Sequence, residues 1–326
     1  MINYFQKNIN RRDRYNTNFI VLQVSLLNNL PIIKENYKKL SEIYEKFLLV
    51  IICPRNECSK FKNNLNQNNI KIIDENEILE KKRFVKIFNQ LLKNKRNKKK
   101  YINRINWYFQ QFLKINYLLK YKKKIVIWDA DTIILKKIFF FKNNHISNNF
   151  GNFFEYHKPY FKTIKALTQK EIPINYLSSV NQFLAITPKE IKKIIKKFIS
   201  IKIYKNRLLL KNIIKSFLKY HEFNHSLFSE YETLGILKME NNNTDQKTIF
   251  FLRYKINGQL SLLQKKIAIF FGAIHYTYEG NKKEKKKILS RKFSNLNFLT
   301  LIIKNYSKYI LRKLQFLFTS KQRRYF

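Results

Sequence analysis

Apolar and polar positions follow two patterns in turn along the first part of the chain. Short runs of β-branched and aromatic residues are typical of buried strands. We expect strands at 19–24, 47–53, 70–73 and 125–128. Between them, the segment 32–46 carries apolar residues at the spacing of a helix. We also expect a strongly basic helical segment at 80–100, with a solvated loop at 93–100, and a helix at 106–121. Because strands that alternate with helices form parallel sheets, residues 18–135 are expected to build a Rossmann-like half.

The second half of the chain has a more mixed pattern. We expect strands at 150–156, 179–187 and 267–275, and helices at 188–200 and 203–220. The apolar run at 267–275 is expected to end the sheet. Together, the two halves predict an α/β fold with a mixed, mostly parallel sheet flanked by helices. The folded domain should cover residues 1–280, with its halves at 18–135 and 136–280.

From residue 281 onward the composition becomes basic and amphipathic, so residues 281–326 are expected to form a helical tail. A basic amphipathic helix can lie on an anionic membrane. It can equally pack on the domain and leave its lysines in solvent. The sequence leaves both alternatives open.

The formal net charge of +45 attracts polyanions such as nucleic acid or an anionic membrane. However, the lysines are spread along the chain, whereas a nucleic-acid reader concentrates its basic residues beside a reading motif. Abundant Lys, Asn, Ile, Phe and Tyr with few Gly and Pro also indicate an AT-rich coding sequence. Nucleic acid is therefore not the expected partner.

The two cysteines, Cys53 and Cys58, match no zinc-site spacing and are expected to be reduced. Residues 1–18 lack the apolar run of a signal peptide, and no stretch reaches the roughly 20 apolar residues that span a bilayer. These features predict a cytoplasmic protein, with contact at the inner face of the membrane if the tail binds there.

Two carboxylates, Asp129 and Asp131, directly follow the expected strand at 125–128. In parallel sheets, ligands bind outside the carboxyl ends of the strands, which is where both aspartates fall. Their hard oxygen atoms suit Mg²⁺ or Mn²⁺, and such a cation in turn binds phosphate oxygens. We therefore interpret the pair as a site for a metal that acts as Lewis acid on a leaving diphosphate. The alternative is an ordinary solvated strand end.

A second group of polar residues lies on the expected helix at 106–121. Trp107, Gln110, Gln111 and Lys114 have the spacing of one helix face. This helix leads into the strand before the two aspartates and must run antiparallel to it, so its first turns, preceded by Arg104, should lie beside them. A basic side chain there can bind a diphosphate. The alternative places Trp107 in the core and lets the glutamines bond to local backbone.

Four motifs stand in order along the chain, at Trp107–Lys114, Ile127–Thr132, Glu155–Phe161 and Phe228–Glu232. Through them, residues 18–278 resemble a little-characterised bacterial family of proposed glycosyltransferases, whose members look like relatives of glycosyltransferase family 8. The resemblance implies a GT-A fold, a divalent cation and a nucleotide-sugar donor. One departure is that no histidine occurs around Ser179–Phe183, where the family pattern has one.

These motifs supply further candidates for the site. Glu155 and His157 follow an expected strand and are candidates for binding sugar hydroxyls, with a surface pair as the alternative. Asn181 and Gln182 join them as substrate-binding candidates. Glu230 is the candidate for binding the acceptor or deprotonating an attacking hydroxyl.

Two other motif residues have a structural interpretation. Ser229 and Glu232 have the spacing of a capping box at the start of a helix. His275 ends the last apolar run, where family 8 enzymes place a histidine that completes the metal shell. The resemblance therefore implies a third metal ligand at His275, with a buried structural histidine as the alternative.

The function predicted from these observations is metal-dependent transfer of a sugar from a nucleotide-sugar donor to a cell-surface glycan or lipid-linked saccharide. The residues expected to bind the donor are Arg104, Gln110, Gln111 and Lys114. The nearest alternative enzyme is a haloacid-dehalogenase phosphatase, but its D-x-D motif opens the domain, and here about 110 residues of folded chain precede it. Ile133 also stands where that motif has Thr or Val. A basic nucleic-acid or membrane-surface binder is the non-enzymatic alternative.

Overall fold

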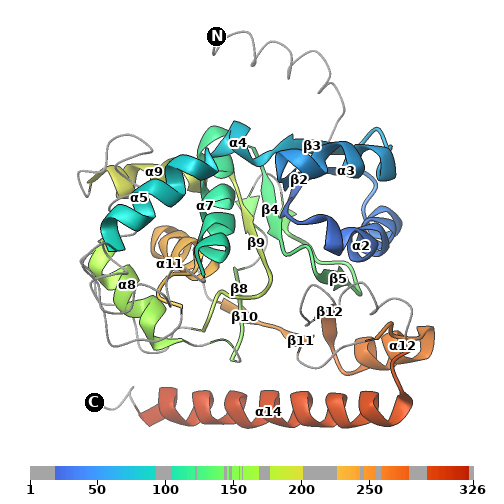
Figure 1. Cartoon of the computed structure of the whole chain (residues 1–326). Coiled ribbons are helices and arrows are strands. Elements are labelled where there is room, and N and C mark those ends of the chain that lie inside the picture. Colours follow the sequence, from blue (N-terminus) through green and yellow to red (C-terminus); the bar gives the residue numbers. More distant parts are fainter. Residues whose placement is uncertain are drawn as a thin grey trace.

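The computed structural model describes most of the chain as an α/β fold (Figure 1). The described residues are 19–92, 104–121, 123–142, 145–146, 149–153, 155, 157–168, 177–200, 226–242, 246–253, 258–278 and 292–322. The helix expected at 203–220 and the start of the basic tail at 281–291 lie outside the described residues.

The central sheet has five strands in the order β3-β2-β1-β4-β9. They are β1 (Ile20–Val24), β2 (Leu48–Cys53), β3 (Ile70–Asp74), β4 (Ile125–Trp128) and β9 (Phe183–Ile186). The first four pair in parallel, and β9 pairs antiparallel with β4. The expected α/β class with a mixed, mostly parallel sheet flanked by helices is therefore confirmed.

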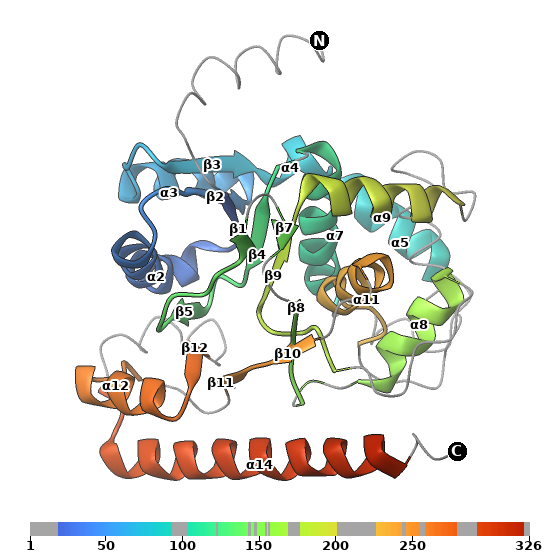
Figure 2. The ribbon, with the colours of Figure 1, turned by 180° about the vertical axis from the view of Figure 1, so that it is seen from behind.

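Helices cover both faces of this sheet, because its strands are apolar on both sides. Along β2, Leu49 and Ile51 belong to one buried cluster, while Val50 and Ile52 belong to the other. The first cluster includes residues of α2 (Leu30–Ile43) and α3 (Cys58–Asn64). The second lies under α5 (Lys81–Leu92), α7 (Ile105–Lys120), α9 (Pro188–Ser200) and α11 (Glu230–Asn242). The sheet is thus the middle layer, as Figure 2 shows from behind.

Short strands build smaller sheets beside the central one. One has the order β11-β12-β5 and contains β5 (Thr132–Ile134), β11 (Phe250–Leu252) and β12 (Ala273–Thr277). The remaining pairs are β6 (Phe141–Lys142) with β7 (His145–Ile146), and β8 (Asn149–Gly151) with β10 (Gln246–Thr248). The strands expected at 150–156 and 179–187 are therefore present only in part, at β8 and β9.

The expected strand at 267–275 is wrong in its first half. Residues Leu262–Phe270 form a helix, α12, which begins with a capping box between Ser261 and Gln264. It ends before Gly272, whose φ of +88° suits glycine and turns the chain into β12. β12 pairs with β5 and β11 rather than ending the central sheet. The strand prediction failed because a short apolar run does not show whether it belongs to a strand or to a helix.

The last helix, α14 (Asn295–Gln322), lies along one edge of the molecule in both views (Figures 1 and 2). Its inner face is buried through Phe298, Leu301, Ile302 and Asn305. The tail therefore packs on the domain. Among the described residues, no helix combines the length and the apolar character needed to cross a bilayer.

Candidate functional site

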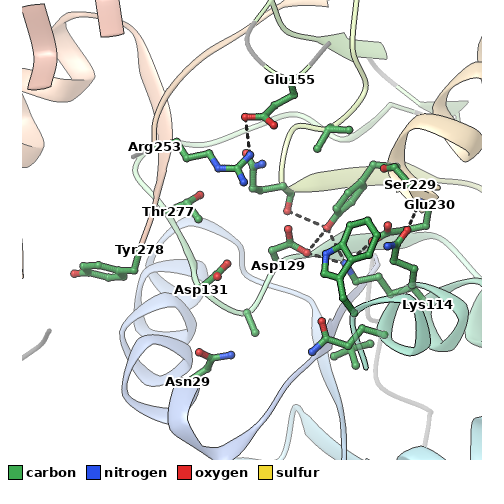
Figure 3. A pocket seen from close by; sticks show the side chains of 18 of the residues that line it. Asn29, Lys114, Asp129, Asp131, Glu155, Ser229, Glu230, Arg253, Thr277 and Tyr278 are labelled. Carbon is green, nitrogen blue, oxygen red and sulfur yellow. Dashed lines mark hydrogen bonds and ion pairs between the residues drawn. The ribbon is translucent and has the colours of Figure 1, made fainter. Parts of the chain in front are cut away.

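A pocket of about 500 Å³ opens at the carboxyl ends of β1 and β4 (Figure 3). In this sheet β1 lies between β2 and β4, so the chain leaves β1 in one direction and returns on its other side. Ligands of open α/β sheets bind at such a switch point. The loop after β1 contributes Asn28 and Asn29 to the lining, and the turn after β4 contributes Asp129 and Asp131.

Backbone hydrogen bonds fix the turn that carries the two aspartates. The backbone N–H of Asp129 donates to the carbonyl of Gln182 at 2.9 Å, and that of Thr132 donates to the carbonyl of Asp129 at 3.1 Å. The indole N–H of the buried Trp128 donates to the carbonyl of Thr132 at 2.8 Å. The turn between β4 and β5 is therefore closed on itself, and both carboxylates line the pocket.

Lys114 links two of the carboxylates from the floor of the pocket. Its Nζ lies 2.7 Å from Oδ1 of Asp129 and 2.6 Å from Oε1 of Glu230. Burial by itself would lower the pKa of Lys114, but the two carboxylates outweigh it and raise that pKa. Burial raises the pKa of Glu230, and Lys114 opposes the rise. Lys114 is thus a permanent cation that holds both acidic side chains in place.

The oxygen atoms of the aspartate pair fit a hard divalent cation. The hydroxyl of Tyr231 also donates to Oδ1 of Asp129, at 2.7 Å. Both donors therefore use the same oxygen, and Oδ2 accepts no hydrogen bond from the described residues. Asp131 lines the same pocket and is partly exposed. The described residues contain no group of three acidic, His or Cys side chains that could hold a metal. Phosphate and water would have to complete the shell, as is usual for Mg²⁺.

The predicted face of α7 points into the pocket as expected. Trp107, Gln110, Gln111 and Lys114 all line it. The carbonyl oxygen of the Gln111 side chain accepts from the backbone N–H of Glu230 at 3.0 Å, so it positions the start of α11. Trp107 packs against the second buried cluster as well as lining the pocket, so it is both a core residue and a lining residue.

The structure does not bring Arg104 and His157 to the pocket. The guanidinium of Arg104 donates to Oγ of Ser226 and lies over the ring of Trp107. Nε2 of His157 is 2.9 Å from the carbonyl oxygen of Ser226. Neither Arg104 nor His157 lines the pocket. Both instead contact Ser226, in the segment before α11. This segment lies beside the first turns of α7, where the hydroxyl of Tyr108 accepts from the backbone N–H of Leu227.

Of the other substrate candidates, Glu155 and Gln182 line the pocket and Asn181 does not. Glu155 lines the pocket and forms an ion pair of 2.6 Å with Arg253. Asn181 is buried outside the lining, where its amide donates to the carbonyl of Phe150 at 2.8 Å. Gln182 lines the pocket with a φ of +60°, a conformation that is costly for a residue with a side chain. Its side-chain oxygen is buried and has no hydrogen-bond partner among the described residues. Such a group is suited to meet a ligand.

The expectation that His275 completes the metal shell is not supported. The side chain is fully buried and does not line the pocket, although Thr277, two residues later, does. Its ring stacks on Phe251 at 4.7 Å and contacts Trp128 and Phe183 edge-on. Burial lowers the pKa of His275 to about 3. The structure therefore favours the alternative of a neutral core histidine among aromatic rings.

The capping box expected at the start of α11 forms only on one side. Oγ of Ser229 accepts from the backbone N–H of Glu232 at 3.3 Å. The carboxylate of Glu232 turns elsewhere, and accepts from the hydroxyl of Ser178 at 2.6 Å and the backbone N–H of Ser179 at 3.0 Å. Glu232 thus ties α11 to the segment that leads to Gln182 and β9.

Glu232 should make stability depend on pH. Burial raises the pKa of its carboxyl to about 7, against the two hydrogen bonds that lower it. A pKa above the unfolded value of about 4.3 favours the folded state at low pH, and this contribution is lost as the pH rises through about 7. Relative to Glu232→Gln, the unfolding free energy should fall by roughly 3 kcal/mol between about pH 4.5 and pH 8. Urea titrations at several pH values measure it, and a constant difference between the proteins would contradict the prediction.

Several lining residues were missed in the sequence. Asn28 and Asn29 follow the first strand, and the switch-point rule could have found them, since the pair stands where a ligand-binding loop is expected. Arg253 follows β11, and Tyr231 and Tyr278 also line the pocket. Tyr231 lies inside the motif at Phe228–Glu232, so that motif could have pointed to it. Arg253 and Tyr278 belong to none of the four motifs, and only the packing of distant segments brings them to the pocket.

The fold and the pocket define an α/β protein with a candidate ligand site at the switch point of its sheet. Residues 35–232 match the model of a family described as a family of unknown function, DUF6492, and the chain belongs to this family. No curated protein matches its sequence. Among solved structures, it is similar to the apo form of mouse xyloside xylosyltransferase 1, with 9% identity and a TM-score of 0.42. That match covers 82% of this chain and 98% of the mouse chain.

Proposed function

We propose that this protein is a glycosyltransferase that moves a sugar from a nucleotide-sugar donor to an acceptor and depends on Mn²⁺ or Mg²⁺. The observation that carries the proposal is the charge of the pocket. Its lining holds four carboxylates, from Asp129, Asp131, Glu155 and Glu230, against two cations, Lys114 and Arg253. The pocket is therefore acidic, although the whole chain has a formal charge of +45.

An acidic pocket at the switch point requires a cation to bind a diphosphate. Without one, the carboxylates would repel the phosphates. A divalent cation at Asp129 and Asp131 would neutralise both the pair and the charge that develops on a leaving diphosphate. Lys114 supports this arrangement because it fixes Oδ1 of Asp129 and leaves Oδ2 for coordination.

The remaining lining residues have roles that suit a donor sugar and an acceptor. Gln110 and Asn29 offer amide groups on the side of α7 and of the loop after β1. Gln182 offers a buried oxygen that lacks a partner among the described residues. Glu155, held by Arg253, can accept hydrogen bonds from sugar hydroxyls. Glu230 has a raised pKa, the direction that suits a group which takes a proton from an attacking hydroxyl.

The acceptor in this proposal is a cell-surface glycan or a lipid-linked saccharide, reached from the cytoplasmic side. The tail helix α14 contacts a segment next to one lining residue of the pocket. The guanidinium of Arg312 donates to the carbonyl of Phe153, two residues before Glu155. The side of the pocket that carries Glu155 is therefore braced by the tail.

The test is a thermal-shift screen of UDP, GDP and ADP sugars in Mn²⁺, followed by calorimetry of the best donor in Mn²⁺ and in EDTA. A bound donor raises the melting temperature by mass action. We expect one donor class to bind in Mn²⁺ and to lose at least a hundredfold in affinity in EDTA. Equal binding in EDTA, or hydrolysis of simple phosphomonoesters in place of donor binding, would count against the proposal.

A further inference from the structure

The helix α14 is apolar on two opposite sides. Its inner side packs on the domain, as described above. Six further apolar side chains of the helix are between 36% and 76% exposed. They are Leu296, Leu299, Ile303, Ile310, Leu311 and Leu314. Because an ordinary surface helix is polar on its outer side, this composition indicates that something covers the outer side as well.

Helix geometry places the exposed residues together. Successive residues turn by about 100° around a helix axis, so Leu296, Ile303, Ile310 and Leu314 fall within one narrow sector. Leu299 and Leu311 lie on its two sides. The sector is centred almost opposite the buried residues of the inner side. We call these six residues the outer stripe of α14.

Basic residues border the outer stripe. Lys304 and Lys313 are exposed and lie at its two edges by the same geometry. Residues 295–322 contain five Lys or Arg and no Asp or Glu. Lysines at the edge of an apolar stripe can keep their ammonium groups in the headgroup layer while their stems lie along apolar surface.

The neighbouring helix α12 adds to the exposed apolar surface. Its N-terminal Leu262 and Leu263 and its C-terminal Phe270 are 70%, 63% and 86% exposed. α12 packs against α14, and the side chain of Gln264 donates to the carbonyl of Phe293, which leads into α14. Exposed apolar surface of this extent marks an interaction site in soluble proteins.

Charge decides between the two simplest partners. A second copy of the chain would bring a helix without acidic residues against its own equivalent, and each chain has a formal charge of +45. Like charges so placed repel each other. An anionic membrane surface supplies both the apolar layer for the stripe and the negative charge for the lysines.

We propose that the outer stripe of α14 docks this protein on an anionic membrane, with the helix lying in the plane of the interface. This inference stands independently of the proposed function. Docking would also affect the pocket, because Arg312 of α14 donates a hydrogen bond to the carbonyl of Phe153. The helix that touches the membrane holds the segment that carries Glu155 into the pocket, so docking places this wall of the pocket close to the lipid surface.

The test measures co-sedimentation with vesicles of phosphatidylglycerol and phosphatidylcholine, compared with vesicles of phosphatidylcholine alone. The decisive variant combines Leu299→Ser, Ile303→Ser and Leu311→Ser, because these side chains are exposed and the change leaves the net charge unaltered. We expect the parent to bind the anionic vesicles, and the triple variant to bind them at least tenfold more weakly. Phe139→Ser, at a side chain that is 66% exposed outside α14, is the matched control and should bind like the parent.

The same comparison separates docking from its rivals. Equal binding by parent and triple variant would mean that net charge alone attracts the protein, and would overturn the proposal. In high salt, the parent should keep part of its binding to anionic vesicles and the triple variant should lose its binding. This outcome would support the proposal, because salt does not screen apolar contacts. A parent that is dimeric without vesicles, and a triple variant that is monomeric, would overturn the proposal in favour of a second copy, as sedimentation equilibrium would reveal.

Discussion

Replacing Asp131 by Asn should reduce donor affinity in Mn²⁺ by at least a hundredfold, to the level seen in EDTA. The substitution removes a negative oxygen that would bind the cation, and it keeps the size of the side chain. Asp131 is the sharper choice of the two aspartates, because Asp129 also holds Lys114 and Tyr231 and its loss would disturb the floor of the pocket. Calorimetry with and without Mn²⁺ measures the effect, and the melting temperature without ligand checks that the variant is folded.

Asp74→Asn is the matched control for this substitution. Asp74 also ends a strand of the central sheet, β3, but it does not line the pocket. Its side chain caps α4 (Glu75–Ile78) by accepting from the backbone N–H of Asn76, a role that Asn performs equally well. Donor affinity in Mn²⁺ should therefore be unchanged. If Asp131→Asn bound the donor as the parent does, the aspartate pair would not be the metal site.

Replacing Lys114 by Met should lower the unfolding free energy by roughly 3 to 5 kcal/mol. Lys114 is almost fully buried between Asp129 and Glu230, so its removal leaves the buried carboxylate of Glu230 without a counter-charge. Burial then raises the pKa of Glu230 without opposition. Since a raised pKa favours the folded state at low pH, the destabilisation should be smaller near pH 5 than near pH 8. Urea denaturation at both pH values measures it.

A second buried lysine provides the control. Among the described residues, no carboxylate forms an ion pair with Lys238, and its Nζ donates to the carbonyl of Ala185 at 3.2 Å. Burial lowers the pKa of Lys238 to about 8, and the charge of Glu190 only partly opposes this. A lowered pKa means that the charged form opposes folding near neutral pH. Lys238→Met should therefore leave stability at pH 7 equal or higher. Equal losses of unfolding free energy in Lys114→Met and Lys238→Met would contradict the role of the ion pair. If the pair matters, adding Glu230→Gln to Lys114→Met should restore part of the lost unfolding free energy.

The candidate site was predictable where one local period places its residues. The face of α7 from Trp107 to Lys114 follows from helical spacing alone, and it lines the pocket. Asp129 and Asp131 follow from the end of an apolar strand in a parallel sheet. Both patterns depend only on neighbouring residues, so they can be recognised without knowledge of the rest of the fold.

The sequence analysis placed side chains wrongly where their hydrogen-bond partners lie far away in the sequence. Arg104 has Ser226 within reach, so it turns away from the pocket. Glu232 has Ser178 and Ser179, and completes no capping box. Nothing in the local sequence marks these contacts, because the segments that provide them are separated from Arg104 and Glu232 by more than 50 residues.

The sequence by itself determined the layered α/β architecture, the position of the acidic pair and the presence of an amphipathic tail, because strand and helix periods are local properties of the chain. Only the tertiary structure decided that Lys114 joins Asp129 to Glu230, that Arg253 reaches Glu155, and that α14 keeps an apolar side in solvent. Periodicity states which residues share a face. It does not state which of two apolar faces the fold will bury, since that depends on the shape of the surface against which the helix packs.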